Sequence, residues 1–360
     1  MNAIQTPMTN ESDLLPWDAL PSRAPLAAPI DPKQLPEIRA EIVAWLQQGM
    51  SAEHWASVEA VSHQAAIDAD ARRYARFLGQ AGLFFVNAEM TDEVIDAADA
   101  MPGYSVTRDD PPSPSGLVVW QHPVTQPALM TNLIGGPMIA ASWSPHPQGF
   151  EVRLWTHQDD WIADEIYAQE HRQQRALPAQ VATALRQTLR RDIPVRLVPT
   201  TVTVLPPVNL ERWPTSAARR LDAIRDGEGM DETLRAVRIA VAGERTLVAT
   251  WKLMRQEIAA QERAQPERAS CKRIARINPD LTTEVRIVSL RRPRPAPGTT
   301  TGTGRTGRVY TDREDVRPHW KNVYHPSDGT HDRRWITSYE RGPHDAPKKA
   351  SGELVSVLRR

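Results

Sequence analysis

The fold class of this chain is decided by three short runs of apolar and β-branched residues: Leu117-Val-Val-Trp120, Met138-Ile-Ala-Ala-Ser-Trp143 and Phe150-Glu-Val-Arg-Leu-Trp155. Runs of this length and composition are typical of β-strands. The segment between the last two, Ser144-Pro-His-Pro-Gln-Gly149, is rich in turn formers and predicts a hairpin connection. The run from Val195 to Leu205 predicts a further strand, in which Pro199 marks an edge or a bulge.

Helical periodicity surrounds these strands. Ile38, Ile42 and Leu46 recur on one face of a 3.6-residue period, which predicts a helix that begins near Pro36. The same kind of pattern predicts further helices over 51–78, 91–101 with Thr91 as N-cap, 178–190, 215–225 and 231–263, the last with a possible interruption at Gly243. The alternating stretch from Thr283 to Leu290 predicts a strand that belongs to a sheet.

We therefore expect an α+β fold, with a helical and mixed N-terminal body and a small β-rich C-terminal module. A length of 360 residues suffices for two or three units. A Pro-rich start and a stretch of Pro, Gly and Thr after Leu290 mark the boundaries. The expected organisation is a disordered tail over 1–35, an α+β domain over 36–205, a helical segment ending in a strand over 206–290, a flexible basic linker over 291–308, and a β-rich basic module over 309–360.

Charge separates the two parts of the chain. Residues 268–360 hold 20 Lys and Arg against 10 Asp and Glu, a net charge of +10; of the chain's 44 and 44, the remaining 24 and 34 give residues 1–267 a net charge of −10. A basic C-terminal part favours an acidic partner, with RNA or DNA as the leading candidates. The sequence leaves open the alternative that the two oppositely charged parts dock on each other.

The single cysteine, Cys271, excludes an internal disulfide framework and favours a reducing compartment, so we expect a cytoplasmic protein. No apolar run reaches the roughly 18 residues of a membrane helix, so no membrane association is expected. The polar, Pro-rich N-terminus does not have the pattern of a signal peptide.

Candidate functional residues gather near the C-terminus, where arginine, histidine and aromatic residues recur every few positions. Cations neutralise phosphates and aromatic rings stack on bases, so this composition predicts nucleic-acid binding. The candidate binding residues are Arg317, Trp320, Lys321, Arg333, Arg334, Trp335 and Arg341. In the alternative interpretation, Trp320 and Trp335 form the core of a small module, and we expect at least one of them to do so. The module is predicted to be a β-meander with strands at 309–310, 316–320 and 335–339 and a turn at 326–329.

Two other functions are compatible with the same residues. Metal-independent RNA cleavage needs a proton acceptor, a proton donor and cations, and the candidate catalytic residues are His319, His331, Lys321 and Tyr339. A protein-interaction or regulatory role would use the acidic N-terminal half instead. Whether the protein is an enzyme is thus left open, and no metal or cofactor is expected, because neither the histidines nor the glycine-rich segments match a known ligand spacing.

A second polar group lies in the N-terminal part and comprises His157, Asp159, Asp160 and Asp164. These residue types could serve as a metal or acid–base site. The favoured interpretation is that Asp159 or Asp160 caps a helix that begins before Trp161.

Several motifs together resemble a family of actinobacterial proteins from plasmids, prophages and actinophages. They are Gly116-Leu-Val-Val, Ala140-Ala-Ser-Trp143, Trp251-Lys-Leu-Met254, Val285-Arg-Ile-Val-Ser-Leu-Arg-Arg292 and Val316-Arg-Pro-His-Trp-Lys321 with His331, Trp335, Tyr339 and Arg341-Gly-Pro343. Relatives usually read Val-Arg-Gly-His followed by an aromatic and a basic residue, so Pro318 replaces a glycine here. The family has no established activity, and the resemblance implies a mobile-element setting.

Overall fold

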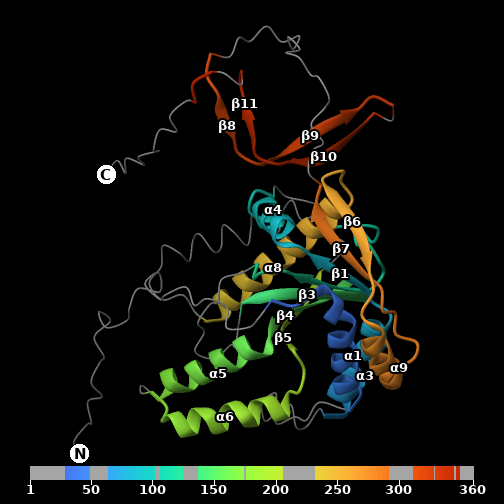
Figure 1. Ribbon diagram of the computed structural model, residues 1–360, viewed down its shortest axis with the longest axis vertical. Coiled ribbons are helices and arrows are strands. Elements are labelled where there is room, and N and C mark those ends of the chain that lie inside the picture. Colours follow the sequence, from blue (N-terminus) through green and yellow to red (C-terminus); the bar gives the residue numbers. More distant parts are fainter. Residues whose placement is uncertain are drawn as a thin grey trace, which may run out of the picture.

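The computed structural model of the chain describes residues 29–48, 64–101, 106–124, 137–173, 176–205, 232–291, 311–327, 329–343 and 346–348. The body is built on a seven-stranded mixed sheet in the order β5-β4-β3-β2-β1-β7-β6 (Figure 1). Its strands are β1 (Gly82–Val86), β2 (Gly116–Trp120), β3 (Met138–His146), β4 (Gly149–His157), β5 (Leu197–Leu205), β6 (Ala259–Ala264) and β7 (Val285–Leu290). Strand β1 pairs parallel with β2 and β7, and the other neighbours are antiparallel. The α+β prediction is confirmed.

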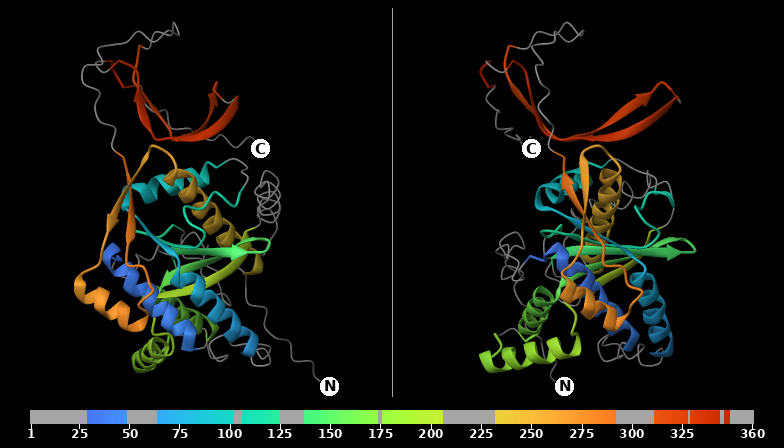
Figure 2. Two further views of the ribbon diagram at one scale, coloured as in Figure 1. Left: turned by 90° about the vertical axis from the view of Figure 1, so that its right-hand side faces the viewer. Right: turned by 45° about the vertical axis from the view of Figure 1, so that its right-hand side comes forward.

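Helices cover both faces of this sheet (Figures 1 and 2). The described helices are η3 (Pro32–Gln34), α1 (Leu35–Gln48), α3 (Gln64–Gly79), α4 (Ala88–Asp99), α5 (Gln158–Arg172), α6 (Ala179–Asp192), α8 (Glu232–Met254) and α9 (Arg268–Ile277). Helices α4 and α8 bury their apolar residues on one face, and α1 and α3 on the other. Helix α9 lies against α1 through Ile274 and Ala40.

Strand alternation divides the core between the two faces. Phe84 and Val86 of β1 contact the α4 and α8 side, whereas Leu83 and Phe85 contact the α1 and α3 side. This is the two-residue period of a strand, because successive side chains point to opposite faces. A strand that is apolar on both faces belongs in the interior of a sheet, and β1 lies between β2 and β7.

Several sequence predictions about the body are confirmed. Strands β3 and β4 form the expected hairpin, with His146 opposite Gly149. Strand β5 lies at the sheet edge, and its pairing with β4 shifts register where Trp155 faces Pro199. Proline has no amide hydrogen to donate to the ladder, which explains why an edge strand tolerates it.

Other boundaries differ from the prediction. Strand β1 was not predicted, and the predicted helix over 231–263 ends at Met254, after which β6 pairs with β7. The N-cap of α4 is Asn87, whose Oδ1 accepts a hydrogen bond from the amide of Met90, so Thr91 lies inside the helix. The structured body also begins before residue 36, because Pro32–Gln34 form a turn of 3₁₀-helix that leads into α1.

Residues 206–290 do not form a unit of their own, since β7 pairs with β1 in the interior of the shared sheet. Gly243 does not interrupt α8. A Cβ atom at Gly243 would lie 2.7 Å from Cδ1 of Leu154, so glycine permits the close approach of helix and sheet. The predicted helix over 215–225, the predicted strand at 309–310 and nearly all of the predicted linker lie outside the described residues.

The C-terminal module is a bent hairpin where a meander was expected. Its strands are β8 (Glu314–Val316), β9 (His319–His325), β10 (Thr330–Ile336) and β11 (Tyr339–Arg341). Strand β9 pairs with β10 and β8 with β11, and one register runs through both pairs, since Val316 faces Tyr339 and His319 faces Ile336. Two residues separate β8 from β9, and two residues at the same level separate β10 from β11. Pro318 is one of the two residues between β8 and β9. The two arms diverge from this break and rise away from the body like the sides of a U (Figure 2).

Candidate nucleic-acid interface

The β9–β10 arm has two distinct faces. Residues that alternate along a strand share a face, and cross-strand partners share it too. One face, here called the body-facing face, carries Trp320, Asn322, Tyr324, His331, Arg333 and Trp335. The opposite face, here called the outward face, carries His319, Lys321, Val323, His325, Thr330, Asp332, Arg334 and Ile336.

The body-facing face is anchored to the body by two tryptophans. Trp335 is 3% exposed and belongs to the core cluster that includes α4 and α8. Its Nε1 donates to Oε2 of Glu93 at 2.7 Å, and its backbone amide donates to Oε1 of Gln256 at 2.8 Å. Nε1 of Trp320 donates to the carbonyl oxygen of Ala97 at 2.9 Å, and the two indole rings lie 5.4 Å apart.

These contacts assign Trp320 and Trp335 to packing. A base could not stack on the ring of Trp335 without displacing the body, so the predicted stacking role does not fit this residue. The same contacts show that the basic C-terminal part docks on the acidic N-terminal part through α4. Helix α4 supplies Glu93 and Ala97 to this contact and carries five carboxylates and no Lys or Arg.

Burial and neighbouring charge act on Glu93. Removal from water raises its pKa, and Asp96 and Asp92 raise it further, while the hydrogen bond from Trp335 acts in the opposite direction. The net effect is a raised pKa, so folding favours the protonated form of Glu93 relative to the unfolded chain.

The outward face holds the cations that are candidates for phosphate contact. Lys321 is exposed and lies directly opposite Arg334, whose side chain is 43% exposed. Nε of Arg334 is 3.9 Å from Oδ2 of Asp332, a long contact that offsets only part of the repulsion between the two cations. Arg317 is exposed at the break between β8 and β9.

The remaining predicted binding residues lie elsewhere on the hairpin. Arg333 is next to Arg334 but belongs to the body-facing face. Arg341 lies on β11 opposite Glu314, on the other arm. The rings of Tyr324 and Tyr339 are the exposed aromatic side chains, at 54% and 45%, and Tyr324 lies on the ring of His331 at 4.9 Å.

The residues proposed for RNA cleavage are not brought together. His319 pairs with Ile336 and His331 with Tyr324, so the two histidines belong to opposite faces. Ile336 lies five positions after His331 along β10, which is about 17 Å of strand. Tyr339 lies beyond the break, on the other arm. A proton donor and acceptor must both reach one substrate, so this arrangement does not support the predicted histidine pair.

The acidic residues around His157 lie in a helix turn and make contacts that stabilise the fold. Asp159 and Asp160 lie in the first turn of α5, and Oδ1 of Asp159 accepts a hydrogen bond from Arg190 at 2.7 Å. Burial lowers the pKa of His157, although the two carboxylates act in the opposite direction. Within the described ranges, no group of three or more His, Cys, Asp or Glu residues is arranged to hold a metal ion.

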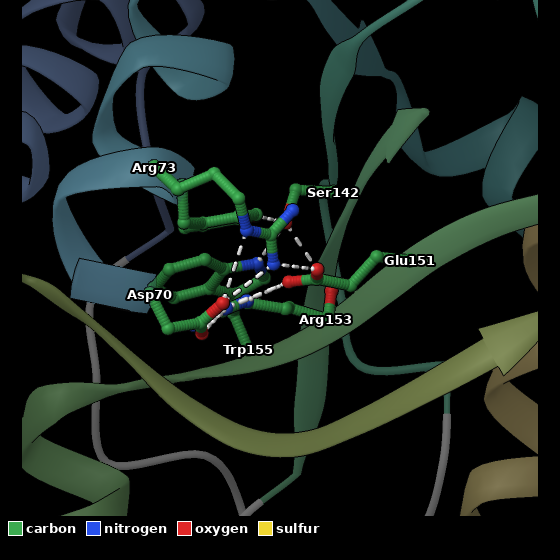
Figure 3. Close-up of polar contacts among 7 residues, drawn as sticks. Asp70, Arg73, Ser142, Glu151, Arg153 and Trp155 are labelled. Atoms are coloured by element: carbon green, nitrogen blue, oxygen red, sulfur yellow. Dashed lines mark hydrogen bonds and ion pairs between the residues drawn. The ribbon is translucent and has the colours of Figure 1, made fainter. Parts of the chain in front are cut away.

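Sequence reasoning missed a charged cluster between α3 and β4 (Figure 3). Nη2 of Arg153 donates to Asp70 at 2.9 Å and to Glu151 at 2.6 Å, and Arg73 binds the same two carboxylates. The guanidinium carbon of Arg153 lies 3.7 Å from the ring centre of Tyr74. The signal was available in the sequence, because Glu151 and Arg153 interrupt a buried strand.

This cluster fastens α3 to the sheet and is assigned to stability. Its two carboxylates and two guanidinium groups balance in charge. The hydroxyl of Tyr74 contacts Oγ of Ser142, which also accepts a hydrogen bond from Nε1 of Trp155 at 2.7 Å. Burial raises the pKa of Tyr74 to about 12.

No protein-family model, no curated protein and no solved structure matches this chain. The resemblance to mobile-element proteins therefore stays a prediction. Across the part of the chain that the structure describes, no helix has the length and apolar character needed to cross a membrane.

Proposed function

We propose that the protein binds nucleic acid through its C-terminal hairpin. The observation that carries the proposal is the cross-strand pair of Lys321 and Arg334 on the outward face. Like charges directly opposite each other destabilise a strand pair, so this pairing is not explained by the stability of the hairpin. A polyanion that binds both cations would offset the repulsion between them and would itself be attracted to the pair.

The electrostatic context supports the same ligand. Residues 268–360 carry a net charge of +10, and Arg317 adds a further exposed cation close to the pair. Phosphate contacts with Lys and Arg supply most of the affinity in non-specific nucleic-acid binding. The proposal includes a cytoplasmic location, where RNA and DNA are both accessible and a chain with one cysteine needs no oxidising conditions.

The test uses the full chain and end-labelled RNA and DNA, each single-stranded and double-stranded, over a series of salt concentrations. Each sample is read for retention and for strand length. The proposal predicts retention of intact strands that weakens steeply as salt rises. Absence of retention at low salt would contradict it, and RNA that is shortened in the presence of EDTA would indicate cleavage instead.

A further inference from the structure

We propose that the ligand is double-stranded nucleic acid, held through its phosphate backbone on the outward face of the bent hairpin. This inference rests on the proposed function and narrows its ligand to one class. It follows from three features of the described residues: the side from which a polyanion can approach, the chemistry of the outward face, and the curvature of the module.

The direction of approach is set by α4. This helix carries its carboxylates at Glu89, Asp92, Glu93, Asp96 and Asp99. The body-facing face of the hairpin lies against α4 through Trp320 and Trp335. Crowding of the charge is visible at Asp96, where burial, then Asp99 and Asp92, raise the pKa. A phosphate backbone is repelled from this side, so the outward face remains for binding.

The chemistry of the outward face fits a duplex better than a single strand. Proteins that bind single strands offer aromatic rings on which the unpaired bases stack. The outward face of β9–β10 has no Trp, Tyr or Phe, because the three rings of this arm, Trp320, Tyr324 and Trp335, alternate onto the body-facing face. A face with two cations and no Trp, Tyr or Phe suits a backbone whose bases are already paired.

The curvature of the hairpin supports the same conclusion. Seven residues in each of β9 and β10 give an arm about 20 Å long, and this length of a parallel duplex carries about 12 phosphate charges on its two strands. The second arm rises from the break on the same side, so the outward face lies inside the U (Figure 2). Buried Trp335 and half-buried Trp320 hold the β9–β10 arm against the body before the ligand arrives, which lowers the ordering cost of binding.

The experiment compares two sets of cations on opposite faces of the same arm. The test variant is Lys321→Ala with Arg334→Ala, and the matched control is Arg333→Ala, which removes the same kind of charge from the adjacent position on the body-facing face. Each full-length protein is titrated into a labelled 20-base-pair DNA, the same sequence as RNA duplex, and the single strand, between 50 and 200 mM salt. Thermal melting of each variant confirms that it is folded.

We expect that the DNA duplex, the RNA duplex or both bind more tightly than the single strand. The wild-type plot of log affinity against log salt should be steeper than that of the double variant by about 1.8, since each lost phosphate contact contributes about 0.9. Over this fourfold salt range the wild type should lose about 12-fold more affinity than the double variant. Arg333→Ala should keep the wild-type slope.

Two results would overturn the inference while leaving the proposed function intact. One is tighter binding of the single strand. The other is a loss of slope in Arg333→Ala as large as that in the double variant. If none of the three nucleic acids is retained at 50 mM salt, the proposed function fails as well.

Discussion

The replacement of Trp335 by alanine tests the assignment of the tryptophan pair to docking. Trp335 is 3% exposed and donates two hydrogen bonds into the body, to Glu93 and Gln256. Truncation of a buried tryptophan to alanine costs about 3–5 kcal/mol. Because Trp335 joins the hairpin to the body, we expect this cost to appear as local release of the hairpin, with the sheet of the body unaffected.

Hydrogen exchange read by mass spectrometry measures this release. A loss of 3–5 kcal/mol raises the open population by roughly 10²- to 10³-fold or more, since each 1.4 kcal/mol is a factor of ten. Amides of β9 and β10 should exchange faster by that factor, while those of β1 and β2 should not change. Trp335→Phe keeps a ring but loses the hydrogen bond to Glu93, so we expect it to destabilise the docked hairpin by about 1.5–3 kcal/mol.

The control is Tyr324→Ala, because Tyr324 belongs to the same face of the arm but is 54% exposed. It should leave the exchange of β9 and β10 within about a factor of five, as expected for a surface substitution. The docking assignment fails if Trp335→Ala leaves the exchange of the hairpin unchanged, or if Tyr324→Ala accelerates it equally.

The stability of the folded protein should also depend on pH through Glu93. Burial raises the pKa of Glu93, the hydrogen bond from Trp335 opposes this, and Asp96 and Asp92 raise the pKa further, so that the net direction is upward. A raised pKa means that the stabilisation from protonation is fully present below the unfolded pKa and is lost as the pH rises through the folded pKa. The contribution of Glu93 to the stability of the folded protein should therefore grow as the pH falls through the carboxylate range, and Glu93→Gln, which keeps an acceptor for Trp335, should remove this contribution in urea denaturation at a series of pH values.

Three further predictions concern the body. Gly116→Ala should lower stability by about 1–3 kcal/mol in thermal melts, because the new Cβ would lie 2.1 Å from the ring of Trp143. Arg153→Met should cost about 1.5–3 kcal/mol in urea denaturation, because buried Glu151 loses one of its two guanidinium partners and keeps Arg73, and Arg153→Met with Glu151→Gln should recover part of this loss. The phenol of Tyr74 should titrate near pH 12 when followed by absorbance. The free energy of unfolding should fall by up to about 2.7 kcal/mol between pH 10 and 12, because the phenol loses its proton at a lower pH in the unfolded state than in the folded state. Tyr74→Phe should remove this fall.

Local sequence pattern predicted most elements of the body but missed strands β1 and β6. The periodicity of Ile38, Ile42 and Leu46 predicts α1, and the β-branched run after Val195 predicts β5. Strand β1 lacks any alternation, since both of its faces are buried, and a five-residue apolar run has no period to read. Strand β6 has the composition Ala-Ala-Gln-Glu-Arg-Ala, which favours helix, and it is a strand because β7 offers an edge for pairing.

The candidate site was predictable in its residue types but not in its geometry. Recurrent Arg, His and aromatic residues identify the C-terminal hairpin. The face on which each residue lies depends on where the strands break, and the interruption at 317–318 is not marked by a hydrophobic pattern. The bond from Trp335 to Glu93 joins residues 242 positions apart, so no local rule could separate packing rings from ligand-binding rings.

Photo-cross-linking from two neighbouring positions of β9 tests the central claim most directly. Val323 belongs to the outward face and Asn322 to the body-facing face. With a photoreactive side chain at one position or the other, full-length protein is irradiated with labelled duplex at low salt. Our account predicts capture of the duplex from position 323 and little or none from position 322; capture from 322 alone, or from neither position, would contradict it.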